Sequence, residues 1–191
     1  MNKKLIVKQN SFKDCGPSCL LSVMRYYKID VSHEELSLNL KMDREGTNAY
    51  NIISVSKLYG LDGYGIHYSS DEIISGKIKL PIIVHVLKNN YYHFIVIYEV
   101  NNNYLTVMDP SVDNIRLDIE TFRKIYLNTC IILYHALIQI YRNKGEIHHE
   151  EKTNHSTGSG SRFVHRDRCC KRSYSCGGRS VIRQFYNRYD F

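Results

Sequence analysis

The sequence predicts an α+β fold in which N-terminal helices pack on one side of an antiparallel β-sheet. Residues 17–60 show helical spacing of apolar residues together with helix-capping signals. Residues 80–136 instead contain short runs of β-branched and aromatic residues, separated by Asn-rich turns. Helices followed by strands along a chain are typical of α+β domains. The 191 residues, 43% of them hydrophobic, are enough for one domain of ordinary size with one core.

The first predicted helix runs from Pro17 to Tyr27. Its apolar residues recur at the i, i+4, i+8 spacing of a buried helical stripe, namely Cys19, Leu20, Val23, Met24 and Tyr27. A proline is tolerated in the first turn of a helix because the amides there lack intrahelical partners. We therefore expect Cys15 at or just before the N-terminus of this helix.

Two shorter elements are predicted next, each from its helix-end signals. Ser32 and Glu35 have the spacing of a capping box, which indicates a short second helix. A third helix is expected to begin near Thr47 or Asn48 and to stop at Gly60, which is placed as a C-terminal glycine cap. The first half of the chain is thus predicted to be mainly helical.

The second half is predicted to be mainly strands. After a short strand at residues 64–69, the β-branched and aromatic runs predict antiparallel strands at 80–87, 92–100, 104–110 and 128–136. Residues 118–126 indicate one more helix before the last strand. The longest apolar segment, residues 125–141, is interrupted by polar residues and is shorter than the roughly 20 residues of a membrane-spanning helix, so it is interpreted as strand plus connector.

The basic charge of the chain belongs to its last fifty residues. Residues 1–141 contain fifteen Lys or Arg and fourteen Asp or Glu, whereas residues 142–191 contain eleven and five. We therefore expect a domain at 1–140 and a basic, largely disordered tail at 141–191. Such a tail attaches weakly to any polyanion, so nucleic-acid binding stays a weaker hypothesis and no specific nucleic-acid partner is expected.

The tail also contains several potential metal ligands, namely His148, His149, His155, His165, Cys169, Cys170 and Cys176. Their spacings match no C-x2-C pattern, so no metal site is expected.

The N-terminus has only a three-residue apolar stretch, far short of a signal-peptide core. We therefore expect a cytoplasmic, reducing location, in which the six cysteines are thiols rather than a disulfide framework.

Cys15 is the candidate nucleophile. A cysteine attacks as its thiolate, which is a minor species at neutral pH unless nearby groups stabilise the anion. Helix N-terminal amides and an imidazolium both do so. The local sequence supplies the helix terminus, so the imidazole has to come from elsewhere in the chain.

His93 is the candidate partner, because hairpin geometry places a carboxylate beside it. A hairpin folded about residues 101–103 puts His93 across from residue 110 or 111, and hence near Asp109. Cross-strand neighbours are close enough for a carboxylate to accept the second ring N–H of an imidazole. His85 has no acid in register, so it is interpreted as a strand histidine, with a role as alternative base left open.

A thiol, a base and an orienting carboxylate from three separate segments are the layout of nucleophilic acyl transfer. The tetrahedral intermediate also needs hydrogen-bond donors for its oxyanion. The side-chain amide of Gln9 and the backbone N–H of Cys15 are the candidates. Cys19 and Cys130 lie on apolar elements and are expected to be core residues.

Four segments together resemble the peptidase C39 family, the papain-like domains of bacteriocin-processing ABC transporters. They are Q-x5-C-G-P-x-C-L at residues 9–20, GTNAYNIISVSKLYGL, HFIVIYEV and VMDP, and the resemblance covers residues 5–137. It implies a papain-like cysteine peptidase with Cys15 as nucleophile, His93 as general base, Asp109 as orienting acid and Gln9 as oxyanion donor. It further implies cleavage after the Gly-Gly motif of bacteriocin or peptide-pheromone leaders, without metal or cofactor. The implied partners are the leader peptide and a membrane ABC transporter, which would bring the protein to the inner face of the membrane.

The chain departs from those transporters because it has no transmembrane bundle and no Walker A signature, so export by this polypeptide alone is not expected. It fits either a stand-alone processing peptidase or a fragment of a transporter gene with an unrelated tail. One alternative function stays open: a non-cleaving module of the same fold that docks leaders for a separate ABC transporter.

Overall fold

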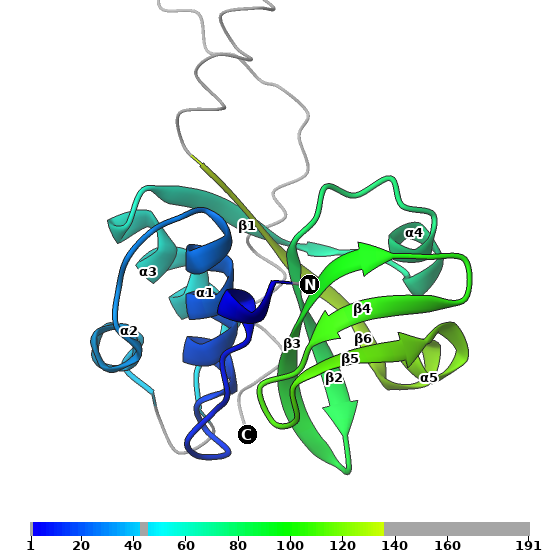
Figure 1. Ribbon diagram of the computed structural model, residues 1–191, viewed down its shortest axis with the longest axis horizontal. Coiled ribbons are helices and arrows are strands. Elements are labelled where there is room, and N and C mark those ends of the chain that lie inside the picture. The colour runs from blue at the N-terminus through cyan, green and yellow to red at the C-terminus, as the bar shows by residue number, and fades with distance from the viewer. Residues whose placement is uncertain (1, 43–45, 136–191) are drawn as a thin grey trace, which may run out of the picture. The chain divides into compact units, whose positions relative to one another are not determined.

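The computed structural model describes residues 2–42 and 46–135 (Figure 1). Its helices are η1 (Lys3–Leu5), α1 (Cys15–Tyr26), α2 (His33–Asn39), α3 (Ala49–Leu58), α4 (Ser70–Ile74) and α5 (Ile119–Ile125). Its strands are β1 (Leu61–His67), β2 (Ile82–Lys88), β3 (Tyr91–Val100), β4 (Tyr104–Met108), β5 (Asn114–Asp118) and β6 (Tyr126–His135). In this described part of the chain, no helix combines the length and the hydropathy needed to cross a bilayer.

The chain divides into two units, Met1–Ile138 and Gln139–Phe191. The tail expected at residues 141–191 lies outside the described residues, and so do its candidate metal ligands. The boundary after residue 140 and the character of the tail therefore stay predictions.

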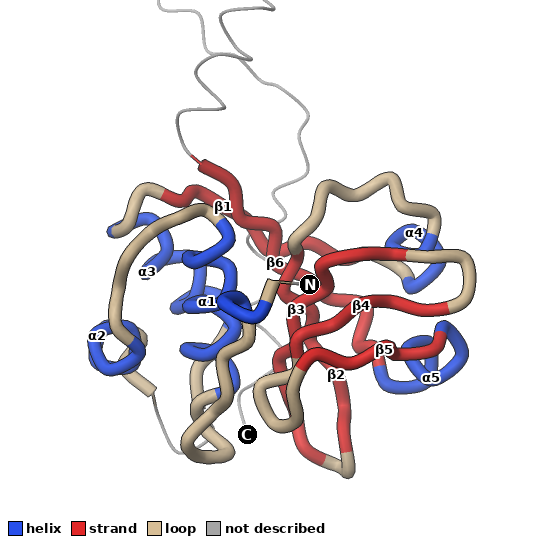
Figure 2. Tube along the Cα trace, in the orientation of Figure 1, coloured by secondary structure: helices blue, strands red, loops and turns tan. Residues whose placement is uncertain are grey.

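The sheet is antiparallel throughout, as predicted, and has the order β1-β6-β2-β3-β4-β5 (Figure 2). The last strand in sequence, β6, lies between β1 and β2 and pairs with both of them. The β3–β4 hairpin forms at the predicted turn, with Asn101 donating from its backbone to the carbonyl oxygen of Tyr104 at 2.9 Å. The sheet therefore brings together strands that are far apart in the sequence, and it includes the hairpin on which the site prediction depends.

Helices cover both faces of the sheet, not one face as expected. The strand residues alternate between two apolar clusters, so that Ile83 faces the cluster containing α1, α2 and α3, and Val84 faces the cluster containing α4 and α5. Figure 1 shows α1, α2 and α3 on one side of the strands and α4 and α5 on the other. The expectation was wrong for the predicted helix α5, and α4, which was not predicted, lies on the same face. Strands β2 and β3 are apolar at consecutive positions, and strands of this kind bury both faces.

The predicted helix ends are confirmed by their capping contacts. Ser32 precedes α2 and its hydroxyl accepts from the backbone N–H of Glu35 at 3.1 Å. Asn48 does the same for α3, accepting from the N–H of Asn51 at 2.8 Å. Gly60 follows α3 with φ of +80°, the left-handed conformation that glycine adopts without strain. Three elements were not predicted: η1, α4 and β5.

Helix α1 is attached to β3 by two side-chain contacts. The sulfur of Cys19 donates to the carbonyl oxygen of Phe94 at 3.2 Å, and the hydroxyl of Ser22 lies 2.6 Å from that of Tyr98. Cys19 and Ser22 are fully buried, so both contacts lie inside the interface. They set the position of the N-terminus of α1 relative to the start of β3.

Candidate active site

Cys15 is the first residue of α1, as predicted. Asp14 precedes the helix, and its carboxylate accepts from the backbone N–H of Ser11 at 2.9 Å, which closes the turn that leads into the helix. The Cys15 side chain is largely buried, with 7% of the residue exposed. The thiol therefore lies beside the first-turn amides of α1, whose partial positive charge favours an anion.

The structure brings His93 and Asp109 together. The Nε2 atom of His93 lies 2.8 Å from Oδ1 of Asp109, and both side chains are buried. The contact follows from the β3–β4 register, in which Val96 pairs with Met108 and Ile97 with Val107, in agreement with the predicted hairpin alignment. Asp109 comes directly after β4, at the same end of the hairpin as His93.

The thiol of Cys15 contacts the same imidazole. Cys15 lies close enough to His93 to raise the pKa of the imidazole, and because Nε2 is bonded to Asp109, Nδ1 is the ring nitrogen left for the sulfur. Burial would by itself lower the pKa of His93, but the hydrogen bond to the Asp109 carboxylate and the electrostatic interaction with the nearby Cys15 raise it to about 9. The imidazole therefore holds its proton at neutral pH, the condition under which it stabilises a thiolate.

The carboxylate of Asp109 is held by two further residues. Its Oδ1 also accepts from the backbone N–H and the hydroxyl of Ser111, at 2.9 Å and 2.7 Å. Its Oδ2 accepts from Nζ of Lys88 at 2.6 Å, and the same Nζ donates to the Ser111 hydroxyl at 2.9 Å. Burial would raise the pKa of Asp109, but the hydrogen bonds from His93, Lys88 and Ser111 lower it below its ordinary value. Asp109 is therefore a carboxylate at neutral pH.

Lys88 and Ser111 were not singled out from the sequence. The contact of Ser111 could have been predicted from the sequence, because an aspartate commonly accepts a hydrogen bond from the backbone N–H two residues later in a turn. The contact of Lys88 could not have been predicted in this way. Lys88 is the last residue of β2, and β2 pairs with β3 and β6 rather than with β4. Only the folded chain brings its ammonium to Asp109.

Gln9 lies next to the segment that follows Asp109. Its backbone N–H donates to the carbonyl oxygen of Pro110 at 3.0 Å. The side-chain oxygen Oε1 of Gln9 is buried and has no hydrogen-bond partner within the described residues. The chain entering α1 and the chain leaving β4 therefore run side by side at the site, and the oxyanion role of Gln9 stays a prediction.

The other candidates are packing residues in the structure. Cys19 and Cys130 are buried in the two apolar clusters, as predicted, and burial raises the pKa of both thiols. The ring of His85 stacks on Phe94 with centroids 5.0 Å apart. Burial, followed by the nearby charge of His93, lowers the pKa of His85 to about 4, so this imidazole is neutral at pH 7.

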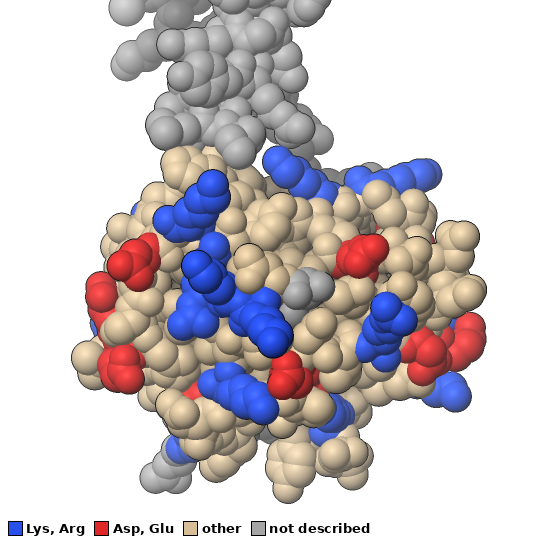
Figure 3. All heavy atoms as spheres, in the orientation of Figure 1, with Lys and Arg blue, Asp and Glu red and all other residues tan. Residues whose placement is uncertain are grey.

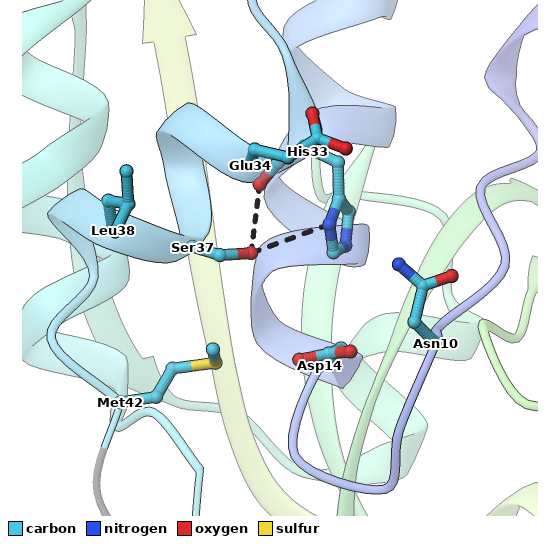
Figure 4. Close-up of a pocket in the computed structure, with 7 residues that line it drawn as sticks. All are labelled: Asn10, Asp14, His33, Glu34, Ser37, Leu38 and Met42. Atoms are coloured by element: carbon cyan, nitrogen blue, oxygen red, sulfur yellow. Dashed lines mark hydrogen bonds between the residues drawn. The ribbon is translucent and has the colours of Figure 1, made fainter.

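Two open hollows adjoin the candidate residues. One, of about 420 Å³, lies between the segment before α1 and helix α2, and its lining includes Asp14, the residue before Cys15 (Figure 4). At its wall, the Ser37 hydroxyl donates to the carbonyl oxygen of His33 at 2.8 Å (Figure 4). The second, of about 380 Å³, is lined by residues 8–12 and 110–112, so it adjoins Asp109 and includes Gln9. Surface depressions are therefore lined by residues next in sequence to Cys15 and to Asp109.

Charges of both signs lie on the face shown in Figure 3, with Lys and Arg side chains gathered over η1 and α1. Arg25 of α1 donates to the backbone carbonyl of Lys4, in η1, at 3.2 Å. Residues 1–141 together have a net charge of only +1, so the described part of the chain lacks the strong positive excess typical of nucleic-acid binding domains.

The family model of the Peptidase C39 family matches residues 3–136. The SPbeta prophage-derived sublancin-168-processing and transport ATP-binding protein SunT of Bacillus subtilis is 32% identical over 134 residues, which are 67% of this chain and 19% of that protein. The lactococcin-G-processing and transport ATP-binding protein LagD of Lactococcus lactis is 28% identical over 123 residues, 64% of this chain and 17% of that protein. The chain thus spans less than a fifth of the length of these curated relatives.

Solved structures show the same fold. A double glycine motif protease from an AMS/PCAT transporter, crystallised with the leader peptide, superposes with a TM-score of 0.64 and 26% identity over 68% of this chain and 90% of that chain. The peptidase domain of Streptococcus ComA, a bifunctional ABC transporter of a quorum-sensing pathway, gives a TM-score of 0.63 and 31% identity, over 68% of this chain and 97% of that one.

Proposed function

This chain belongs to the peptidase C39 family, and from that membership we propose that its domain at residues 1–140 is a cysteine endopeptidase that cuts peptides after the Gly-Gly motif of a leader. The observation that carries the proposal is one shared imidazole: His93 is hydrogen-bonded to Asp109, and Cys15 lies close enough to the same ring to raise its pKa. A nucleophile, a base and an orienting acid in contact are what acyl transfer requires.

In the proposed first step, the Cys15 sulfur attacks the carbonyl carbon of the second glycine. His93 holds the proton that the thiol gives up, and the charge of Asp109 stabilises the resulting imidazolium. The tetrahedral intermediate collapses when His93 passes this proton to the amide nitrogen of the scissile bond. The C–N bond breaks, the cargo peptide leaves with a free amine, and the leader remains on Cys15 as a thioester.

In the second step, water replaces the cargo peptide. His93, now neutral, takes a proton from the water molecule, whose oxygen attacks the thioester carbon. The C–S bond breaks, the leader leaves as a carboxylic acid that gives its proton to solvent, and the sulfur of Cys15 is again the anion beside the imidazolium of His93. Asp109 keeps the ring in one orientation through both steps.

The oxyanion formed in each step needs donors placed before the reaction. The backbone N–H of Cys15, in the first turn of α1, is one candidate because such amides have no intrahelical partner. The side-chain amide of Gln9 is the other, and the hydrogen bond from the Gln9 backbone to Pro110 supports it by holding Gln9 beside the site.

The substrate class is inferred from the relatives, whose names describe processing of sublancin-168 and lactococcin G, and from a structural neighbour bound to a leader peptide. We infer bacteriocin or peptide-pheromone leaders as substrates. A membrane ABC transporter is the inferred partner, because these relatives are transport ATP-binding proteins. The proposed location is the cytoplasm, at the inner face of the membrane where such a partner would recruit the protein.

A cleavage assay tests the proposal. The purified 191-residue chain is incubated with a panel of Gly-Gly leader peptides, and mass spectrometry locates each cut. We expect one cut, after the second glycine, and none when that glycine is replaced by valine. The variant Cys15→Ala should lose turnover but retain leader binding, because it removes the sulfur and little else.

Two results would contradict the proposal. Turnover by Cys15→Ala would show that another group is the nucleophile. Binding of leaders by the unmodified chain without any cut would instead support the alternative of a non-cleaving module that docks leaders for a separate transporter.

A further inference from the structure

Lys88 is part of the hydrogen-bond network around Asp109, although it comes from a strand that does not pair with β4. Its Nζ lies 2.6 Å from Oδ2 of Asp109 and 2.9 Å from the hydroxyl of Ser111. The Asp109 side chain is only 4% exposed, whereas that of Lys88 is 33% exposed. The ammonium therefore reaches a buried carboxylate from the edge of the site.

The two oxygens of Asp109 are divided between different partners. Oδ1 accepts from His93 and Ser111, and Oδ2 accepts from Lys88. A carboxylate can rotate about its Cβ–Cγ bond and exchange its oxygens unless both are held. With Lys88 on Oδ2, rotation would break a short charge-assisted hydrogen bond, the strong kind in proteins.

We propose that Lys88 is a positioning residue of this site, which holds Asp109 so that one carboxylate oxygen is permanently presented to His93. This inference rests on the proposed peptidase function only for its consequence on cleavage. The positioning itself concerns Asp109 and His93 and is measurable without a substrate.

The charge of Lys88 has a second effect, on the proton of His93. The titratable groups around this imidazole are Cys15 and Cys19 from α1, His85 and Lys88 from β2, and Asp109 after β4. Asp109 and Cys15 favour the imidazolium, and a cation paired with Asp109 weakens that attraction. Lys88 thus keeps the proton affinity of His93 below the value that Asp109 alone would set, which eases the later transfer of the proton to the leaving amine.

Two variants of Lys88 test whether its ammonium acts on the site. Lys88→Met removes both the donor and the charge, whereas Lys88→Arg keeps both. The control is Lys57→Met, which removes a lysine from another Lys–Asp pair, with Asp62, on the surface of α3. NMR titration of imidazole-labelled protein, with the His93 signal assigned by its loss in His93→Gln, reports the pKa of His93 in each variant.

We expect Lys88→Met to raise the pKa of His93 by about half to one unit, because an unscreened carboxylate a few ångström away has an effect of that order. Lys88→Arg and Lys57→Met should both titrate as the unmodified chain does. Cleavage of a leader peptide by Lys88→Met should show a five- to tenfold lower kcat with nearly unchanged KM. An unchanged pKa together with an unchanged kcat in a folded Lys88→Met protein, as judged by circular dichroism, overturns the inference.

The outcomes for this inference and for the proposed function are distinguishable. If the unmodified chain cuts no Gly-Gly peptide but Lys88→Met shifts the His93 titration, then the positioning role stands and the peptidase proposal fails. If the unmodified chain cuts leaders, and Lys88→Met has the same pKa of His93 and the same kcat as the unmodified chain, then the peptidase proposal stands and the positioning role fails.

Discussion

The sulfur of Cys19 lies 3.2 Å from the carbonyl oxygen of Phe94 and donates a hydrogen bond to it. Cys19 is one helical turn beyond Cys15, and Phe94 directly follows His93. This contact therefore joins the helix that carries the candidate nucleophile to the strand that carries its imidazole, one turn away from the site. It therefore helps to set the distance between the Cys15 sulfur and the His93 ring, on which the proposed chemistry depends.

Replacing Cys19 by alanine should weaken both the fold and the site. The loss of a buried sulfur and of its hydrogen bond should lower the free energy of unfolding by about 1–2 kcal/mol in urea titrations. Cys130→Ala is the matched control, because Cys130 is equally buried but lies in the other apolar cluster. Both variants should lose stability, and only Cys19→Ala should also slow leader cleavage; equal loss of activity in the two would contradict the role of the α1–β3 contact.

Gly16, next to the nucleophile, should not tolerate a side chain. A Cβ at this position would lie 2.0 Å from Cγ2 of Thr47, far inside van der Waals contact. We expect overpacking in Gly16→Ala to cost about 1–3 kcal/mol of stability and to lower the melting temperature by several degrees. The double variant Gly16→Ala, Thr47→Ala removes the clashing methyl group and should recover most of that loss, measured by differential scanning calorimetry. No recovery would mean that the backbone of α1, rather than Thr47, requires glycine.

The pair of His93 and Asp109 should make stability depend on pH in a defined direction. The pKa of His93 rises from 6.5 to about 9 on folding, so its contribution is complete below pH 6.5 and is lost as the pH rises through 9. It amounts to at most about 3 kcal/mol. The pKa of Asp109 is lowered, so its contribution is present above its ordinary value near 4 and is lost on further acidification. The pair therefore stabilises the fold most between about pH 4 and 6.5.

Urea unfolding at pH 6 and pH 9.5 measures this effect. Cys19 and Cys130 also have raised pKa values and weaken the fold at high pH, so the unmodified chain has to be compared with His93→Gln. The loss of stability between the two pH values should be smaller in His93→Gln. Equal losses in both proteins would show that the proton of His93 does not stabilise the folded state.

Gln9 should affect the rate of cleavage and not the binding of the leader. If its side-chain amide donates to the oxyanion, Gln9→Ala should lower kcat by about 10²- to 10³-fold with little change in KM. Gln9→Glu has nearly the same shape but replaces the donor by an acceptor, so it should be at least as slow. Steady-state kinetics on one leader peptide separate the cases, and a normal kcat in Gln9→Glu would remove Gln9 from the mechanism.

Local signals in the sequence predicted most of the fold. The apolar stripe from Cys19 to Tyr27 gave α1, the caps at Ser32 and Asn48 gave the starts of α2 and α3, and the β-branched runs gave four of the six strands closely. Helix α4 was missed although Ser69 and Glu72 form a complete capping box, a signal that was available. These elements share one property: their residues favour the observed conformation through neighbours in the same segment.

Strand β5 was missed for a different reason. Its five residues, Asn114 to Asp118, alternate between exposed and half-buried positions and include only two apolar side chains. The segment is a strand because β4 offers it a free edge, with Thr106 paired to Arg116. Helices cover both sheet faces for a similar reason, because the positions of α4 and α5 depend on the strands that precede them in the chain.

The sequence by itself determined the helix that begins at Cys15 and the hairpin that sets His93 beside Asp109, because both depend on spacings of a few residues and on the geometry of one turn. Only the tertiary structure decided that the thiol meets that imidazole and that Lys88 holds the second oxygen of the carboxylate. The physical reason is that these contacts join segments whose relative placement comes from burying apolar side chains on both faces of the sheet. Hydrophobic burial is non-directional, so the sequence around Cys15, His93 and Lys88 contains no local pattern that predicts which of them will be in contact.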